Sequence, residues 1–293
     1  TGIWTKHFAK SFNRSRGEEM SQVFIVTGAA SGIGLALTQQ LLKQGTKVCA
    51  CDIHLAELEK LSQNLNTDQL MVQQLDVRHV QNWEAVIQKV LQQWQRIDVL
   101  CNVAGVLREN WVADATENDV NLHFDINVKG TILGTQAVLP HMLSKNKGHI
   151  INMASLAALS PVPGLALYSA SKFAVRGYSL AAGMELAERG IAVTTICPDA
   201  VQTPMLDQQK DKAQAALTFS GTRALTTEEV VEAILGPALH DKPLEIVLPA
   251  WRGVIAKAAN AFPSITAHQV KRMREIGMKR QQKIRQGSES TKK

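Results

Sequence analysis

The sequence predicts an α/β fold: a doubly wound, mostly parallel seven-stranded sheet with helices on both faces. Short apolar runs alternate with longer amphipathic segments, the pattern of strand–helix–strand units. Most of the runs are continuously apolar, as in parallel strands that are buried on both faces. The 293 residues are 45% hydrophobic and 20% charged, an ordinary globular composition that is sufficient for a large core.

Seven apolar runs are expected to be strands, and helical patterns fill nearly every interval between them. Parallel neighbours need right-handed crossovers, which these helices would supply. Residues 20–249 contain no repeat or low-complexity linker and are predicted to form one domain, with a polar, mobile lid at about 199–222 whose ordering depends on ligand. The expected strands are Val23–Thr27, Lys47–Cys51, Leu70–Asp76, Asp98–Asn102, His149–Met153, Ala192–Cys197 and Glu245–Leu248.

Two segments flank this domain. Residues 1–19 are polar and basic and lack the apolar stretch of a secretory signal, so we interpret them as an extension that precedes a start at Met20. Residues 250–293 are expected to form an amphipathic helix and, after a break at Pro263, a basic tail. The helix would either cover its own domain and the substrate cleft or lie on an anionic membrane. Its apolar positions are Trp251, Val254, Ile255, Ala258, Ala259 and Phe262, opposite Arg252 and Lys257.

The net charge of +6 comes from one end of the chain. Residues 268–293 carry nine Lys/Arg and two Glu, so the rest of the chain sums to −1. No aromatic residue lies among these basic residues, which argues against nucleic acid as a partner and leaves a solvated helix or contact with an anionic surface. No apolar run approaches the roughly 18 residues of a membrane span.

The four cysteines do not form a metal or redox motif. Cys49, Cys51, Cys101 and Cys197 each lie in a predicted strand, where a free thiol is a small buried apolar group. We therefore expect reduced thiols, a cytoplasmic location and no bound metal.

The first predicted strand runs into the turn TGAASGIG at residues 27–34, and a helical pattern follows over 35–44. Glycines allow the backbone to approach a pyrophosphate, whose charge meets the amino terminus of the helix. Asp52 ends the second strand, 18 residues after Gly34. It could bind ribose hydroxyls and repel a 2′-phosphate, which favours NAD(H) over NADP(H), or it could close the strand or cap the next helix. No Lys or Arg occurs at 28–34 or at 53 and 54.

The spacing of these glycines resembles the short-chain dehydrogenase/reductase family, with further matching motifs over residues 22–204. The resemblance implies a Rossmann-type sheet that binds a dinucleotide. Val103 and Asp199 depart from the family pattern, and Asp199 could form an Asx turn or tune binding near the nicotinamide. The implied cofactor contacts are Thr27, Gly28, Ser31, Gly32, Ile33, Gly34, Asp52, Asp76, Val77, Asn102, Ala104, Gly105, Tyr168, Lys172, Pro198, Val201 and Thr203.

Tyr168 and Lys172 lie four residues apart on one predicted helix face. We expect the ammonium group of Lys172, together with an oxidised nicotinamide, to lower the pKa of Tyr168 from about 10, so that the phenol acts as general acid or base. Ser155 ends the fifth strand and would hold the substrate oxygen. The resemblance adds Asn127, which would anchor a water in a proton relay through Lys172, and it gives Lys172 a contact with the nicotinamide ribose.

The segment between Ser155 and Tyr168 is almost wholly apolar. It predicts an apolar alcohol or ketone substrate, such as a lipid, steroid, retinoid or aromatic carbonyl, although such a segment could instead pack against its own sheet or a partner. The candidate substrate contacts, in addition to Ser155, are Leu156, Val162, Leu165, Met205 and Leu206.

The sequence therefore predicts an NAD(H)-dependent alcohol dehydrogenase or carbonyl reductase. A 3-ketoacyl reductase that acts on carrier-bound acyl chains and a non-catalytic dinucleotide-responsive protein are the alternatives. The resemblance also implies a homodimer or homotetramer that pairs through the helices of Asn127 and Tyr168.

Overall fold

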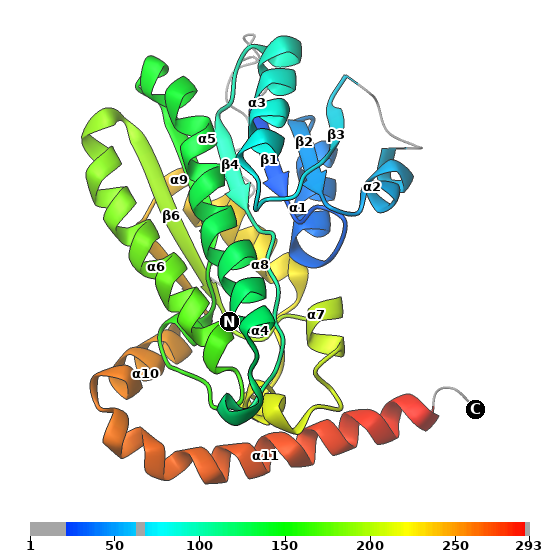
Figure 1. Ribbon diagram of the computed structural model, residues 1–293, viewed down its shortest axis with the longest axis vertical. Coiled ribbons are helices and arrows are strands. Elements are labelled where there is room, and N and C mark those ends of the chain that lie inside the picture. The colour runs from blue at the N-terminus through cyan, green and yellow to red at the C-terminus, as the bar shows by residue number, and fades with distance from the viewer. Residues whose placement is uncertain (1–21, 63–67, 291–293) are drawn as a thin grey trace, which may run out of the picture.

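The computed structural model of the chain describes residues 22–62 and 68–290, so the predicted extension at 1–19 and the start at Met20 lie outside the described residues. Seven strands form one sheet in the order β3-β2-β1-β4-β5-β6-β7, and every pairing is parallel (Figure 1). The doubly wound parallel sheet is confirmed. The strands are β1 Val23–Thr27, β2 Lys47–Asp52, β3 Leu70–Gln74, β4 Val99–Asn102, β5 Gly148–Met153, β6 Ile191–Pro198 and β7 Glu245–Leu248.

The strand order reverses between β1 and β4, which creates a crevice beyond the carboxyl ends of the strands. Helices α1 and α8 pack on one face of the sheet, and α3, α5 and α6 pack on the other. The longer helices are α1 Gly32–Lys43, α2 Leu55–Ser62, α3 Val80–Trp94, α4 Glu117–His123, α5 Gly130–Lys145, α6 Ala166–Leu186, α8 Thr227–Ala233, α10 Ala250–Ala261 and α11 Pro263–Ser290, with short turns α7 Pro204–Asp207 and α9 Leu239–Asp241.

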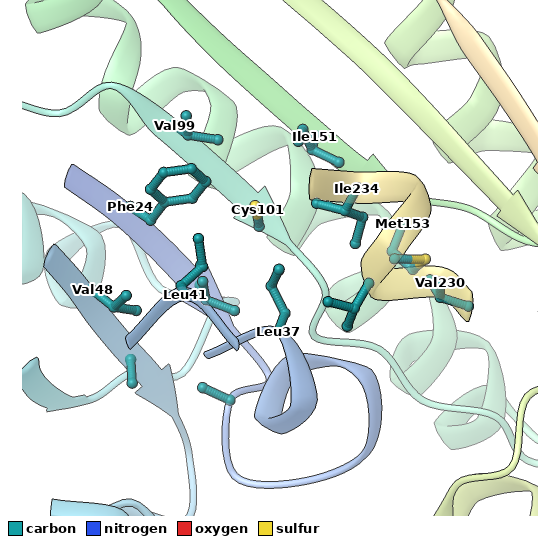
Figure 2. Close-up of a cluster of buried hydrophobic side chains, with 14 of the residues drawn as sticks. Phe24, Leu37, Leu41, Val48, Val99, Cys101, Ile151, Met153, Val230 and Ile234 are labelled. Carbon is teal, nitrogen blue, oxygen red and sulfur yellow. The ribbon is translucent and has the colours of Figure 1, made fainter. Parts of the chain in front are cut away.

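Side chains of β1 alternate between two apolar cores. Phe24 and Val26 pack with Leu37 and Leu41 of α1 on one face (Figure 2). Ile25 faces the other core, which includes Trp83 of α3. Since both faces of β1 are covered, all five of its residues are buried, and this explains the continuous apolar run in the sequence.

Several predicted boundaries differ from the observed ones by one to three residues. The structure begins α1 at Gly32 instead of residue 35 and extends β2 to Asp52. It ends β3 at Gln74, two residues before the predicted Asp76. Asp76 instead lies in a turn, because its carboxylate accepts hydrogen bonds from the backbone N–H and the guanidinium of Arg78.

The predicted lid and tail are more regular than expected. The lid contains α7 and a 3₁₀ helix, η5, at Ala213–Ser220, in which Ala215, Ala216 and Phe219 are buried. Pro263 does not end helical structure but begins α11, since proline is well tolerated in the first turn of a helix. Helix α11 packs along η5 and crosses the carboxyl-end side of the molecule (Figure 1). None of the helices over residues 22–62 and 68–290 is long and apolar enough to span a membrane.

Candidate active site

The turn between β1 and α1 depends on glycine at three positions. Gly28 and Gly32 adopt positive φ angles of 70° and 52°. A Cβ at Gly28 would lie 2.9 Å from Cα of Ala104, and one at Gly34 would overlap the carbonyl oxygen of Gly28. The backbone is therefore compact around the amino terminus of α1, where N–H groups and the helix dipole favour an anion.

Two predicted cofactor contacts lie behind this turn. The hydroxyl of buried Thr27 accepts hydrogen bonds from the N–H groups of Val103 and Ala104, both at 3.0 Å. The amide of buried Asn102 donates to Oδ1 of Asn152 at 2.9 Å and to the carbonyl of Thr131 at 3.3 Å. Thr27 and Asn102 are not among the residues that line the cleft, and their side chains hold the turn after β4 in place. Their contact with the cofactor stays a prediction.

A cleft with a volume of about 1100 Å³ runs along the carboxyl ends of the strands. It extends from the end of β2, past the glycine turn, to the segment after β5 and the lid. The predicted residues on its walls are Gly28, Ser31, Gly32, Ile33, Gly34, Asp52, Asp76, Val77, Ala104, Gly105, Ser155, Tyr168, Lys172, Pro198, Val201 and Thr203.

The Asp52 carboxylate borders the cleft at the end of β2. Its Oδ2 accepts from the N–H of Ala30 at 3.1 Å, and its Oδ1 accepts from the N–H of His54 at 3.0 Å. These backbone hydrogen bonds fix the carboxylate beside the glycine turn.

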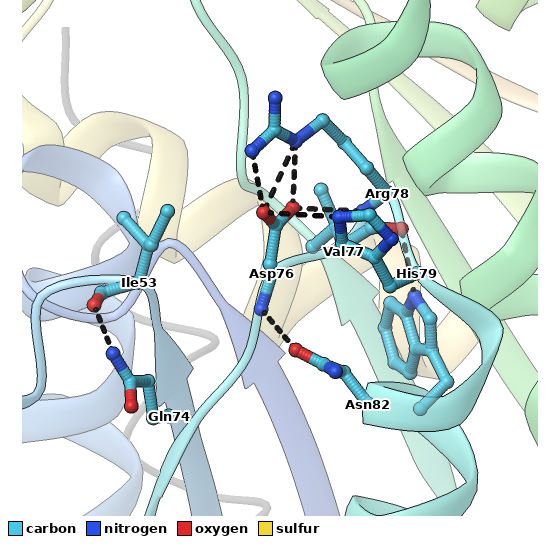
Figure 3. A network of polar contacts seen from close by, with 8 residues as sticks. Ile53, Gln74, Asp76, Val77, Arg78, His79 and Asn82 are labelled. Atoms are coloured by element: carbon cyan, nitrogen blue, oxygen red, sulfur yellow. Dashed lines mark hydrogen bonds and ion pairs between the residues drawn. The ribbon is translucent and has the colours of Figure 1, made fainter.

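Arg78 also lines this end of the cleft, and the sequence analysis missed it because it follows β3, outside the positions searched for a phosphate ligand. Its guanidinium forms a two-pronged contact with Asp76, with Nε–Oδ1 at 2.9 Å and Nη2–Oδ2 at 2.6 Å (Figure 3). This hydrogen bonding lowers the pKa of Asp76. The positive charge of Arg78 is thus already matched by a carboxylate.

Tyr168 and Lys172 lie together on α6 at the centre of the cleft. Nζ of Lys172 donates to the carbonyl of Met153 at 2.8 Å and lies 5.7 Å from the centroid of the Tyr168 ring. Burial raises the pKa of Tyr168 to about 12, although hydrogen bonding with Ser155 acts in the opposite direction. Burial also lowers the pKa of Lys172 to about 8. The predicted lowering of the Tyr168 pKa refers to the complex with an oxidised nicotinamide and stays a prediction. In the protein alone, desolvation of the phenol raises its pKa.

Asn127 lies in a π-helical turn, η2, at Phe124–Lys129 between α4 and α5. Its Oδ1 accepts from the N–H of Val106 at 2.8 Å, and its Nδ2 donates to the Val106 carbonyl and to Oγ of Ser171, both at 3.0 Å. The buried side chain ties the loop after β4 to α6. A Cβ at Gly105 would lie 3.2 Å from Oδ1 of Asn127 and 3.4 Å from Nζ of Lys172, so Gly105 lets these two groups approach. The water relay stays a prediction.

The far part of the cleft is largely apolar. The structure places all the predicted substrate side chains on its walls: Leu156, Val162, Leu165, Met205 and Leu206. Helices α10 and α11 supply another wall, through Ile255, Ala259, Phe262, Val270 and Met273. The amphipathic helix therefore borders the cleft of its own domain, and the expected contact with an anionic membrane stays a prediction. The sequence did not predict the lining residues of α11, because that segment is rich in Lys and Arg and was expected to be a basic tail.

Asp199 forms an ion pair with Arg252 of α10 at 2.6 Å, and the two side chains are only 14% and 18% exposed. Burial raises the pKa of Asp199, with Arg252 acting in the opposite direction. Arg252, which the sequence places opposite the apolar face of this helix, lines the cleft. Helix α10 packs closely on β7 at Gly253, where a Cβ would lie 2.6 Å from Val247. Asp199 therefore links the start of the lid to α10.

The described residues contain no group of three or more His, Cys, Asp and Glu side chains that could hold a metal ion. Cys49, Cys51, Cys101 and Cys197 are free and buried.

Comparison with known proteins agrees with this geometry. The family described as short chain dehydrogenase matches residues 22–214. The chain belongs to this family. It is 33% identical over 214 residues to an uncharacterized oxidoreductase of Staphylococcus haemolyticus, a match that covers 73% of this chain and 89% of the relative. It is 34% identical over 228 residues to cyclopentanol dehydrogenase of Comamonas sp., covering 75% and 90% of the two chains. The protein is thus a member of a family of oxidoreductases.

Solved structures with the same fold include nicotinamide cofactor complexes of both kinds. The closed form of serine dehydrogenase complexed with NADP+ is 34% identical with a TM-score of 0.69, over 77% of this chain and 94% of that one. 4-Hydroxyisoleucine dehydrogenase complexed with NADH, at 22% identity and a TM-score of 0.70, covers 78% and 96% and shares the fold. The family fold binds a nicotinamide dinucleotide, and these neighbours leave the choice of dinucleotide open.

Proposed function

We propose that the protein is an NAD(H)-dependent dehydrogenase or reductase that interconverts an apolar primary or secondary alcohol and its carbonyl compound. The observation that carries this proposal is the meeting of Ser155, Tyr168 and Lys172 in one cleft with the glycine turn. A dinucleotide-responsive protein without turnover would not need a phenol, a hydroxyl and an ammonium group side by side on the wall of an apolar chamber.

The residues of the cleft fit a dinucleotide. Gly32, Ile33 and Gly34 bring the amino terminus of α1 to the wall of the cleft, where its N–H groups would bind a pyrophosphate. Asp52, held by the N–H groups of Ala30 and His54, would accept hydrogen bonds from the adenosine ribose. Since its charge opposes a 2′-phosphate and Arg78 is paired with Asp76, we propose a preference for NAD(H). When bound, the nicotinamide supplies or accepts the hydride.

The side chains around the reacting carbon would handle the proton. A pKa of about 12 keeps the Tyr168 phenol protonated near neutral pH, ready to donate to a carbonyl oxygen during reduction. The Ser155 hydroxyl would hold the same oxygen while charge develops on it. Lys172, fixed by the Met153 carbonyl, is a positioned cation 5.7 Å from the centroid of the Tyr168 ring.

The apolar chamber supports a substrate that is apolar beyond its oxygen. Leu156, Val162 and Leu165 line this part of the cleft together with Met205 and Leu206 of the lid. Such walls exclude water from the reacting centre and bind by burial of apolar surface. The relative in Comamonas is named for cyclopentanol, a small alicyclic alcohol, and this supports the same substrate class. The four buried free thiols support a reducing, cytoplasmic location.

The test compares two tyrosine variants, since the chain has only two tyrosines. Tyr168→Phe removes the proton donor but keeps the ring, and we expect turnover with NADH and a panel of cyclic and aromatic ketones to fall by roughly 10²–10⁴-fold. Tyr178→Phe, which changes the tyrosine of α6 that lies outside the cleft lining, should retain activity.

A fluorescence titration with NADH and NADPH should accompany the assay. We expect both tyrosine variants to bind NADH like the parent protein, and NADH to bind at least tenfold more tightly than NADPH, a difference of about 1.4 kcal/mol. Retained turnover in Tyr168→Phe would refute the proposed mechanism. Tighter binding of NADPH would refute the assigned role of Asp52 and favour the carrier-bound acyl reductase.

A further inference from the structure

The outer side of α10 and the start of α11 presents large apolar side chains to solvent. Trp251, Val254, Ile255, Phe262 and Ile265 are between 56% and 70% exposed. Their positions in the sequence place them within about four helical turns of one another along a helix pair that forms one edge of the molecule (Figure 1). Clustered exposure of this kind typically marks an interaction surface.

The same edge is strongly basic. Residues 250–274 include no acidic side chain. Farther along α11, Arg272, Ile276, Lys279 and Lys283 follow Ile265 at helical spacing and share its exposed side, whereas Gly277 and Gln281 on the other side are buried. The surface therefore combines an apolar centre on α10 with a basic stripe on α11.

The apolar surface is continuous with the cleft. Ile255, Phe262 and Ile265 line the cleft and are each at least 60% exposed, so they stand at its mouth. A ligand that leaves the chamber between α10 and α11 would pass directly over these side chains.

We propose that this surface docks on an anionic lipid bilayer and that apolar substrate enters the cleft from the lipid. The route of entry rests on the proposed function, whereas the docking does not. An apolar helix face flanked by Lys and Arg suits the boundary between headgroups and acyl chains. A second copy of the chain is the weaker candidate, because a two-fold contact through this edge would bring the basic stripe of one copy toward that of the other.

Co-sedimentation of the full chain with vesicles tests the docking without any substrate. Vesicles of equimolar phosphatidylcholine and phosphatidylserine should pull down the protein, and added salt or pure phosphatidylcholine should weaken binding. Val254→Asp, on a side chain outside the cleft lining, should weaken binding at least tenfold, and Arg272→Glu should also weaken it. Val80→Asp is the control, since Val80 is 46% exposed and begins α3, which lies at the opposite end of the molecule from α11 (Figure 1).

Activity measurements separate docking from function. Val254→Asp should reduce a water-soluble cyclic ketone as the parent does but require more of an apolar ketone supplied in vesicles. The docking proposal fails if the parent ignores anionic vesicles, if Val254→Asp binds them normally, or if Val254→Asp merely converts a dimer into a monomer by light scattering. Vesicle binding without turnover on any ketone would overturn the route and the proposed function but leave the docking intact.

Discussion

At the scale of single residues, burial sets the protonation of the candidate site. Desolvation favours the neutral form of both Tyr168 and Lys172, with pKa values of about 12 and about 8. The protein alone thus holds the proton on the phenol. A positive charge beside Tyr168, such as that of an oxidised nicotinamide, would lower the pKa of the phenol. The acid–base chemistry of Tyr168 therefore depends on which form of the cofactor is bound.

This arrangement predicts opposite pH dependences for the two reaction directions. Alcohol oxidation needs the Tyr168 phenolate, so its kcat/KM should rise about tenfold per pH unit through the range below the pKa of Tyr168 in the complex. Carbonyl reduction needs the phenol and should not rise with pH. Initial rates in both directions between pH 6 and 10 check this, and an oxidation rate that is flat over that range would exclude Tyr168 as the base.

His149 in β5 should make the free energy of unfolding decrease at acidic pH. Its Nε2 lies 2.9 Å from Oγ1 of Thr194, and burial lowers its pKa to about 4. A histidine in the unfolded chain has a pKa near 6.5. As the pH falls below 6.5, the unfolded chain is therefore protonated before the folded one. The free energy of unfolding is at its full value above pH 6.5 and decreases as the pH falls toward 4. The loss is about 3 kcal/mol.

The measurement is urea unfolding at several pH values. His149→Gln keeps a donor for Thr194 but cannot titrate, so its unfolding free energy should fall less steeply between pH 6.5 and 4 than that of the parent. His240→Gln, which changes an exposed histidine, should follow the parent curve. Equal slopes for the parent and His149→Gln would contradict the assignment.

Residue-scale prediction succeeded where the chemistry is local in the sequence. The turn at 27–34 and the pair Tyr168 and Lys172 are each contained within a few residues, so spacing alone places them on one element. Arg78 and Arg252 reach the cleft from other elements, and only the folded chain shows their carboxylate partners, Asp76 and Asp199. The desolvation that raises the pKa of Tyr168 in the protein alone is likewise a tertiary property, which spacing along the sequence does not reveal.

At the scale of elements, α11 is fitted to the lid. Backbone approaches backbone at Gly277, where a Cβ would overlap the carbonyl oxygen of Ala216 in η5. Nε2 of Gln281 donates to the carbonyls of Gln209 and Lys212, both at 3.0 Å, and Nη1 of Arg280 donates to the carbonyl of Ser220 at 2.7 Å. Helix α11 thus supplies hydrogen-bond donors to carbonyls of the lid and holds it over the cleft.

Gly277→Ala should therefore loosen the lid. Moving α11 away from Ala216 breaks its donor contacts, so we expect a lower melting temperature and a higher KM for apolar ketones, with NADH affinity unchanged. Gly177→Ala is the matched control, because a Cβ at Gly177, an exposed position in α6, meets nothing within 4 Å. Alanine there should stabilise the helix by about 0.5–1 kcal/mol. A Gly277→Ala protein as stable as Gly177→Ala would refute the close contact.

The elements with a strong period were predictable, whereas α11 was not. Helix α10 shows apolar residues at helical spacing, but α11 is rich in Lys, Arg and Gln and exposes most of its surface. Its contact with η5 relies on Gly277 and Gln281, residue types that carry little helix or core signal in a sequence. The regular structure of the lid went unpredicted for the same reason, since η5 is ordered by a partner far along the chain.

At the scale of the whole molecule, the parallel sheet gathers the site. All seven strands end on the same side of the molecule, so the loops after β1, β2, β4, β5 and β6 meet along one edge of the sheet. Helices α10 and α11 cover that edge, which is the lower one in Figure 1. The cofactor end and the apolar chamber are thereby parts of one continuous cleft. The docking surface on α10 and α11 lies at the apolar end of that cleft.

Helices α4, α5 and α6 form the face toward the viewer in Figure 1, whereas α10 and α11 run along the lower edge. The resemblance predicts pairing of copies through these helices, and exposed apolar side chains there fit that use: Met184 of α6 is 65% exposed, and Val120 and Phe124 are 39% and 36% exposed. Light scattering after size exclusion should give a multiple of the 32.0 kDa chain mass. Met184→Glu should weaken the assembly by placing like charges at a two-fold contact, whereas Val254→Asp should leave it intact. A parent protein of 32.0 kDa would exclude the oligomer, and dissociation by Val254→Asp would move the contact to α10.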